Sequence, residues 1–184
     1  MTVEPASSRT FVARRMTRLM GRFARARDGA TAVEFALIAL PFFALLFGIL
    51  ELGLLFVLST SLDNATNKVS RTIRTGSPPA SAAAFKQAVC NELGWLATDC
   101  TNNLFVDVDA FATFDQIVTP RPIDVNGVVR DGDYTTGQPE QIILVRVYYQ
   151  WKLIAPLITK AVENVAGGKT LVTSTMTFKT EPYS

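Results

Sequence analysis

The sequence contains no histidine and only two cysteines among its 184 residues. Histidine is the side chain most often used as a general base near neutral pH and the most common metal ligand in proteins. Two cysteines cannot by themselves complete the four-ligand site that a structural zinc ion requires. The composition therefore gives little support to a catalytic or metal-binding protein, and we expect neither enzymatic activity nor a cofactor.

Charge is also scarce, and it is unevenly distributed. Only 18% of the residues are charged and the formal net charge is +2. Residues 1–29 carry seven arginines and two acidic side chains, so this segment has a net charge of +5, whereas the rest of the chain has a net charge of −3. A basic arm of this kind can bind nucleic acid, but arginines beside an apolar segment more simply keep that side of the membrane in the cytoplasm. We expect a cytoplasmic leader at 1–29 and no nucleic-acid partner.

The arginines of the leader allow two interpretations. Five of them recur at helical spacing, which could form one basic stripe lying on anionic lipid. In the other interpretation the leader is disordered and its arginines only follow the positive-inside rule. The five arginines are Arg14, Arg15, Arg18, Arg22 and Arg25.

One long apolar run follows the leader. Phe35–Leu50 contains sixteen uncharged residues, and after Glu51 the run resumes to Leu58. As a helix these 24 residues would span roughly 36 Å, against about 30 Å for the hydrocarbon core of a bilayer. A secretory signal has a shorter apolar region and ends in a small-x-small cleavage site, and no such site follows Leu58. We predict a transmembrane helix at 30–58 that stays in the mature protein and contacts membrane lipids.

Two residues within this run are unusual for a membrane helix. Pro41 removes one backbone donor and predicts a kink. Glu51 introduces a carboxylate, which costs about 2.5–3.5 kcal/mol at the bilayer centre and less near the interface. We expect Glu51 to lie toward the far side of the membrane and to reach the opposite headgroups.

Beyond Leu58 the helical pattern continues without the membrane composition. Apolar residues recur at spacings of three and four with polar residues between them, which predicts an amphipathic helix. Gly76, followed by Ser77-Pro78-Pro79, is a strong stop signal. We predict one helix from Ala30 to Thr75, with residues 59–76 as its extension beyond the membrane. The apolar stripe consists of Leu62, Ala65, Val69 and Ile73.

Residues 77–184 predict a small α+β periplasmic domain with an antiparallel sheet. A helix is expected first, and alternating β-branched and aromatic residues then indicate strands. Turns are expected at Asp131-Gly132 and, as a tight hairpin, at Asn126-Gly127. The expected elements are a helix at 80–96, strands at 104–111, 141–151 and 170–178, and a short helix at 152–165 that Pro156 interrupts.

The two cysteines, Cys90 and Cys100, both fall in this domain. In an oxidising periplasm they would form a disulfide. In the alternative interpretation Cys90 is only a small core residue, although an exposed free thiol at Cys100 in a polar loop would be unusual.

Asp107 and Asp109 form the one carboxylate pair that suggests catalysis. The alternation of the strand places both on its outer face, and paired carboxylates serve in glycoside hydrolysis. Solvated strand faces carry such pairs routinely, and no histidine is present to activate a serine, cysteine or threonine. We therefore interpret the pair as solvent-exposed and expect that the protein is not an enzyme.

The segment Gly29-Ala30-Thr31-Ala32-Val33-Glu34-Phe35 resembles the class III signal of type IV pilins. In that family a prepilin peptidase cuts after a glycine on the cytoplasmic side, and glutamate is the fifth mature residue. Counting from Ala30, Glu34 is fifth and Phe35 sixth. More closely, GATAVEFALIALPFFALLFGILELG followed by LDNATNKVSR resembles the TadE-like family, pseudopilins of the tight-adherence (Flp) pilus machinery. The match covers about residues 28–75, and the tail Thr180-Glu181-Pro182-Tyr183 is similar to endings in that family.

The resemblance implies a minor pilin or pseudopilin that supports pilus assembly and surface adhesion. It implies cleavage between Gly29 and Ala30, and contacts with prepilin peptidase, other Tad pilins and the assembly platform. The expected location is the bacterial inner membrane, with a cytoplasmic N-terminus and a periplasmic domain, and incorporation into the pilus stays open. Glu34 could neutralise the new amine of a neighbouring subunit or stabilise the first turn against the helix dipole. The alternative function is an uncleaved single-pass anchor whose domain binds a partner of the secretion machinery.

Overall fold

The computed structural model describes residues 27–94, 97, 99–119, 121–154 and 162–182. The chain separates into two compact units, Met1–Leu46 and Phe47–Ser184, and each is considered by itself. The predictions for the arginine-rich leader fall almost wholly on residues 1–26, outside the described residues.

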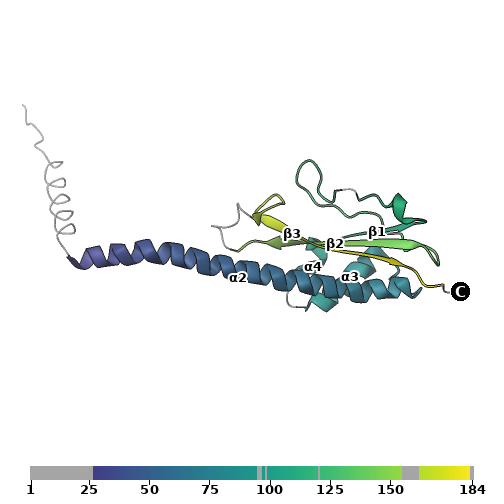
Figure 1. The fold of residues 1–184 in the computed structure, drawn as a ribbon, viewed down its shortest axis with the longest axis horizontal. Coiled ribbons are helices and arrows are strands. Elements are labelled where there is room, and N and C mark those ends of the chain that lie inside the picture. Colours follow the sequence, from purple (N-terminus) through teal and green to yellow (C-terminus); the bar gives the residue numbers. More distant parts are fainter. Residues whose placement is uncertain (1–26, 95–96, 98, 120, 155–161, 183–184) are drawn as a thin grey trace, which may run out of the picture. The chain divides into compact units, whose positions relative to one another are not determined.

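Helix α2, Arg27–Arg74, begins in the first unit and ends in the second (Figure 1). The predicted helix from Ala30 to Thr75 is confirmed, with ends that differ by one to three residues. Pro41 lies inside α2, which continues past it. The C-terminal end follows the glycine signal, because Gly76 adopts a positive φ of 78° and Ser77 N–H donates to Thr72 C=O at 2.8 Å. This is the bond pattern that closes a helix with glycine in the left-handed conformation.

The second unit contains an antiparallel sheet of three strands in the order β1-β2-β3. The strands are β1 Leu104–Phe111, β2 Ile142–Lys152 and β3 Lys169–Lys179. In the central register Val106 pairs with Val147, which pairs with Ser174. The fold class is therefore α+β as predicted, and all three expected strands are present within one residue of their predicted bounds.

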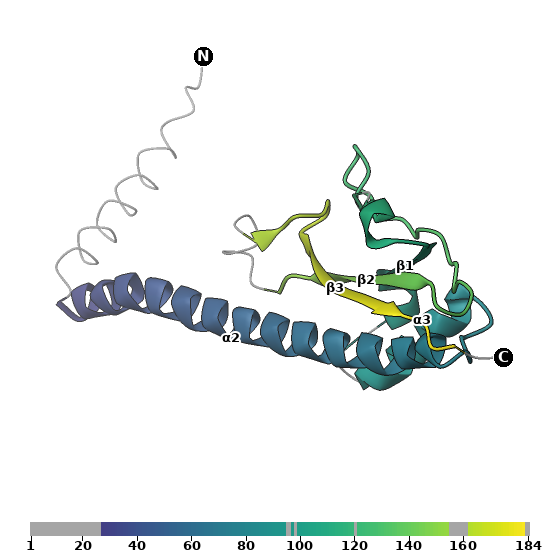
Figure 2. The ribbon, with the colours of Figure 1, turned by 45° about the vertical axis from the view of Figure 1, so that its right-hand side comes forward.

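One face of the sheet packs against helices. Val145, Val147 and Tyr149 of β2 belong to the same buried cluster as the predicted stripe of α2. Figures 1 and 2 show the C-terminal half of α2 running along this face. Apolar residues that recur every second position in the strand therefore pack in one core with apolar residues that recur about every 3.6 positions in the helix. The α2 residues of this core are Leu58, Leu62, Ala65, Val69 and Ile73.

Helix α3, Ala82–Leu93, is shorter than the helix predicted at 80–96. Ser81 caps its start, because the Ser81 hydroxyl accepts a hydrogen bond from Ala84 N–H at 3.2 Å. Gly94 follows the last turn with φ of 58°, and its N–H donates to Cys90 C=O. The prediction followed the apolar spacing and overlooked this serine and this glycine, which are ordinary start and stop residues for a helix.

The long connection between β1 and β2 differs from the predicted hairpin and turn. Asp124 N–H donates to Val128 C=O, so Asn126-Gly127 lies in a turn wider than a two-residue hairpin. The prediction of a turn at Asp131-Gly132 is wrong. Gly132 N–H instead donates to Val106 C=O and Val108 N–H to Asp133 C=O, so this segment runs along β1. A free strand edge attracts backbone partners, and here the chain itself covers the edge.

Two short elements flank β1. Helix α4, Cys100–Asn103, leads directly into β1, and a 3₁₀ turn, η2, occupies Phe114–Gln116. Half of the helix predicted at 152–165 falls on 155–161, outside the described residues. At its described ends the prediction is wrong, because Lys152 is the last residue of β2 and Val165 forms an antiparallel bridge with Lys169.

Candidate functional site

The residues of the expected cleavage and assembly site lie at the start of α2. The helix begins at Arg27, so Gly29 and Ala30 are in its first turn. Ala30 and Glu34 are exposed, and the Phe35 side chain is 70% exposed. Because Ala30 and Glu34 are four residues apart, they share one side of the helix. The backbone N–H groups of a first turn have no partner within the helix.

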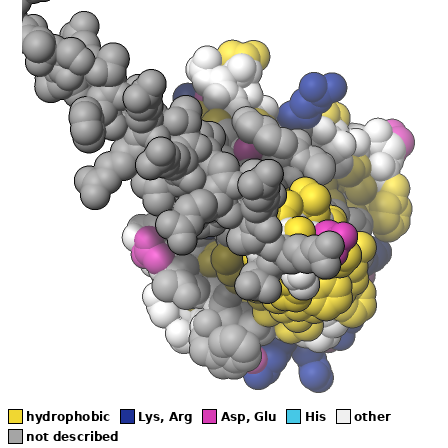
Figure 3. Space-filling model, turned by 90° about the vertical axis from the view of Figure 1, so that its left-hand side faces the viewer, with side chains coloured by type: hydrophobic (Ala, Val, Ile, Leu, Met, Phe, Trp, Pro, Cys, Tyr) yellow, Lys and Arg dark blue, Asp and Glu magenta, His cyan; other side chains and the backbone are white. Residues whose placement is uncertain are grey.

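The helix surface that follows is apolar on all sides and uncovered. From Val33 to Leu46 the large apolar side chains are 38–70% exposed. Figure 3 shows hydrophobic side chains gathered into a patch on the surface of the molecule. In the part of the chain that the structure describes, α2 is the one helix long and apolar enough to cross a membrane. A helix that is hydrophobic all round is typical of a membrane segment.

Glu51 has a different environment from the one predicted. Its side chain is 3% exposed and belongs to the second unit. The carboxylate accepts hydrogen bonds from Ile154 N–H at 2.9 and 3.0 Å and from Trp151 Nε1–H at 3.4 Å. The expectation that the Glu51 carboxylate reaches the opposite headgroups is therefore wrong, because Trp151 of β2 and Ile154, two residues after β2, supply its donors. A buried carboxylate is tolerated where such donors compensate its lost hydration.

The carboxylate pair on β1 is also different from the prediction. Asp107 is buried and forms an ion pair with Arg146 of β2, which is 4% exposed. The Arg146 guanidinium lies 3.7 Å from the Asp109 carboxylate. Burial, followed by repulsion from Asp107, raises the pKa of Asp109. The pair thus faces away from the helices as predicted, but Asp107 is held in an ion pair instead of standing in solvent.

Arg146 is the residue that the sequence analysis missed. Arg146 and Tyr148 are two residues apart in β2, so their side chains lie on the same face of the sheet. In the register Arg146 pairs with Asp107 of β1. A single arginine within a strongly apolar strand was the available signal, because a buried charge needs a partner. Gly132 packs over this ion pair, and a Cβ at that position would collide with the Asp107 side chain.

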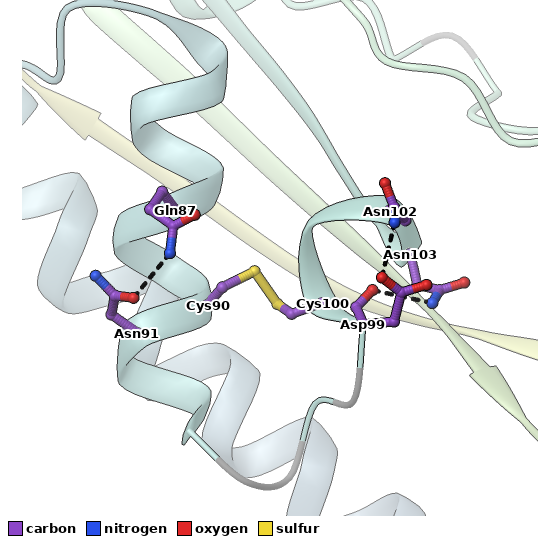
Figure 4. Close-up of a disulfide and its surroundings, with 7 residues drawn as sticks. All are labelled: Gln87, Cys90, Asn91, Asp99, Cys100, Asn102 and Asn103. Carbon is purple, nitrogen blue, oxygen red and sulfur yellow. Dashed lines mark hydrogen bonds between the residues drawn. A yellow bond between two sulfur atoms is a disulfide. The ribbon is translucent and has the colours of Figure 1, made fainter.

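The structure joins Cys90 of α3 to Cys100 of α4, with Cα atoms 5.7 Å apart (Figure 4). Next to the bridge, Asn102 and Asn103 donate to Asp99, which precedes α4 (Figure 4). The bridge fixes α3 against the short helix that leads into β1. Both sulfur atoms are therefore engaged, which leaves neither thiol for metal binding or nucleophilic chemistry.

Further contacts attach α2 and its following loop to the domain. Glu181 N–H donates to Arg74 C=O at 2.9 Å, and Lys68 pairs with Glu92 of α3 at 2.8 Å. The Tyr134 hydroxyl donates to Pro79 C=O at 2.9 Å, and burial raises the pKa of Tyr134 to about 12. These contacts lie within the second unit and hold the end of α2 on the folded domain.

Within the described residues, no three acidic or cysteine side chains converge on a space that would hold a metal ion. The features with functional potential are therefore the exposed head of α2, its apolar surface and the Glu51 contact.

The comparisons with known proteins concern the head and the body of α2. Residues 29–71 match the model of the TadE-like protein family. No curated protein and no solved structure matches the chain. The matched segment starts at Gly29, includes Glu34 and Glu51, and ends three residues before the last residue of α2. The resemblance seen in the sequence is therefore confirmed, because residues 29–71 of this chain are similar to the TadE-like protein family.

Proposed function

We propose that the protein is a minor pilin or pseudopilin of a tight-adherence pilus system. It is inserted through α2 in the bacterial inner membrane, with the leader in the cytoplasm and the second unit in the periplasm. Prepilin peptidase cuts it between Gly29 and Ala30, and the mature protein supports pilus assembly together with other pilins and the assembly platform. The observation that carries the proposal is the Gly29–Glu34 spacing at the head of an exposed apolar helix that matches the TadE-like family.

The position of the Gly29–Ala30 bond supports its cleavage. The bond lies in the first turn of α2, three residues from its start. A terminal turn opens at low free energy, and glycine stabilises a helix by about 1 kcal/mol less than alanine. Local unwinding at Gly29 would therefore expose the bond to a peptidase without disturbing the apolar body of the helix.

Glu34 has the position required for subunit registration. Its carboxylate is exposed on the otherwise apolar surface of α2. Cleavage creates an amine at Ala30, one turn from Glu34, and the two groups are on the same side of the helix. When helices associate in a low-dielectric bundle, the carboxylate of one subunit can offset the amine of its neighbour. Such a pair would fix the axial position of each subunit.

The uncleaved anchor is a second candidate. The observation that favours it is that α2 already contains the Gly29–Ala30 bond in helical form, and this turn must open before a peptidase can act. In that case the domain would act from the inner membrane on a partner of the secretion machinery. Both candidates share the same membrane topology, and the N-terminal residue of the mature protein distinguishes them.

Intact-mass analysis of the protein from cells that contain prepilin peptidase tests the proposal. We expect loss of residues 1–29, and we expect Gly29→Leu to prevent it. Gly53→Leu is the matched control, because Gly53 also lies in α2 and has open space at its Cβ position. A mature species that starts at Met1 in the wild-type protein would favour the anchor instead.

The role of Glu34 is tested separately. Glu34→Ala should reduce the amount of pili while the protein still fractionates with the inner membrane. Normal piliation in this variant would contradict the proposed registration.

A further inference from the structure

We propose that the end of the domain formed by Trp151, Lys152, Ile154 and Lys169, here called the basal surface, rests on the anionic phospholipid surface of the membrane that holds α2. The inference rests on the membrane insertion in the proposed function, and it adds a second lipid contact outside the helix. It also assigns Glu51 as the residue that fixes the level of this contact.

The Glu51 hydrogen bonds determine where the basal surface lies along α2. Both Glu51 oxygens accept from Ile154 N–H, and Oε1 also accepts from Trp151 Nε1–H. All three residues belong to the second unit. The end of β2 and the turn of α2 around Glu51 therefore share one level within a few ångströms.

The helix around Glu51 still belongs to the apolar run. Leu50, Leu52 and Phe56 are 55%, 53% and 74% exposed on the sides of α2 that the domain leaves open. Exposed apolar side chains on both sides of Glu51 indicate a lipid environment at this level. Because the domain begins at the same level, its end at Ile154 meets the boundary between lipid and water.

The residues of the basal surface match that boundary. Ile154 is 68% exposed, and Trp151 is half-buried with its indole N–H turned toward Glu51. Lys152 and Lys169 form the last register pair of β2 and β3, so both lysines lie at this end of the sheet, where the Lys169 ammonium also donates to Gln150 Oε1 at 3.0 Å. Tryptophan is enriched at membrane interfaces, and lysines near the surface are attracted by anionic lipids. The chemistry therefore fits phospholipid headgroups.

Nitroxide labels on the full chain test the inference in vesicles that contain phosphatidylglycerol. The native cysteines are paired, so a single introduced cysteine is the only reactive thiol. Ile154→Cys reports on the basal surface. Leu40→Cys reports on the inserted helix. Val125→Cys, at a fully exposed turn of the long connection, reports on water.

We expect the label at position 154 to collide several-fold less often with a water-soluble nickel chelate, and more often with oxygen, than the label at 125. If the label at 154 is as accessible to the chelate as the label at 125, while the label at 40 is lipid-exposed, the inference is wrong and the proposed function stands. A label at 40 that is accessible to the chelate would instead show that α2 does not insert, which contradicts the proposed function.

Neutralising the lysines gives a second readout on a folded protein. Lys152→Gln/Lys169→Gln should make the label at 154 more accessible to the chelate. With both lysines in place, vesicles of phosphatidylcholine alone should raise the accessibility of this label in the same way. Lys179→Gln, at the opposite end of β3, is the control and should change nothing. Equal accessibility with and without the two lysines would contradict the role of anionic lipid.

Discussion

The two parts of α2 make opposite use of apolar residues. From Val33 to Leu46, in the first unit, large apolar side chains point in every direction and are 38–70% exposed. From Leu58 to Ile73, in the second unit, apolar side chains recur every three or four residues and are at most 6% exposed. Burial in this helix therefore does not follow hydrophobicity. It follows periodicity, because a folded domain can cover only one side of a helix.

The comparison also indicates what each part needs from its surroundings. The amphipathic part is complete within the chain, since the sheet and α3 cover its stripe. The uniformly apolar part has no cover within the described residues of its unit, and an exposed surface of this kind requires an apolar medium or other helices. Four variants, ordered from the largest expected effect to the smallest, test this difference.

The largest effect is expected from Leu62→Ala in the amphipathic part. Leu62 is fully buried in the core, and removing such a side chain costs about 2–5 kcal/mol of unfolding free energy. Leu40→Ala is the matched control in the uniformly apolar part, where the side chain is 69% exposed. Urea unfolding of the protein in detergent, followed by near-ultraviolet circular dichroism, measures both. Equal losses would show that the two parts share one core, against the comparison.

The disulfide is expected to give the next effect, again confined to the second unit. It closes a loop of eleven residues between α3 and α4. A disulfide that closes a loop of this size raises the free energy of unfolding by about 2–3 kcal/mol. Cys90→Ser/Cys100→Ser should lower the unfolding free energy by this amount and leave membrane insertion unchanged. Retained wild-type stability in the double variant, measured by the same urea titration, would contradict a structural role for the bridge.

Periodicity explains why much of the fold was predictable from the sequence. The α2 stripe, its glycine stop and the three strands each carry a local signal, and each was found within a few residues. The resemblance over residues 29–71 was predictable for the same reason, because the motif from Gly29 to Glu34 lies within one short stretch of the sequence.

The failed predictions for Glu51, Asp107 and Gly132 depended on contacts between distant residues. Glu51 and Ile154 are 103 positions apart, and Asp107 and Arg146 are 39 apart. Their partners follow from strand register and from the placement of α2 on the sheet, neither of which has a local signal. The predicted turn at Gly132 is wrong for the same reason, because the Asp107 side chain of the ion pair beneath it leaves no space for a Cβ.

Glu51 lies where the two parts of α2 meet and gives the third prediction. Glu51→Leu makes the apolar run continuous but removes the acceptor of Ile154 N–H, and an unsatisfied buried donor costs about 1–3 kcal/mol. Glu51→Gln keeps one acceptor oxygen and should lose less. The domain should thus be less stable although the helix becomes more hydrophobic, as urea unfolding will show. Unchanged stability of Glu51→Leu would mean that the contact does not hold the domain on α2.

The smallest effect concerns pH and the face of the sheet away from α2. The pKa of Asp109 is raised, chiefly by burial and then by repulsion from Asp107. The folded state therefore binds this proton more tightly than the unfolded state. Stability from this group is fully present below the unfolded pKa and is lost as the pH rises through the folded pKa. Asp109→Asn should remove this loss and raise stability at neutral pH by about 0.5 kcal/mol or less.

Asp124 provides the control of opposite sign for this pH dependence. Hydrogen bonds from the backbone N–H groups of Val128 and Asn126 lower the pKa of Asp124, with the Val128 bond the larger cause. Its contribution is therefore present above the unfolded pKa and is lost as the pH falls through the folded pKa. Asp124→Asn should lower stability at neutral pH where Asp109→Asn raises it. Urea titrations between acidic and neutral pH compare the two variants, and shifts of the same sign would contradict the opposite environments of these two carboxylates. Neither substitution should alter insertion of α2, because both residues lie in the second unit, far along the chain from the uniformly apolar part of the helix.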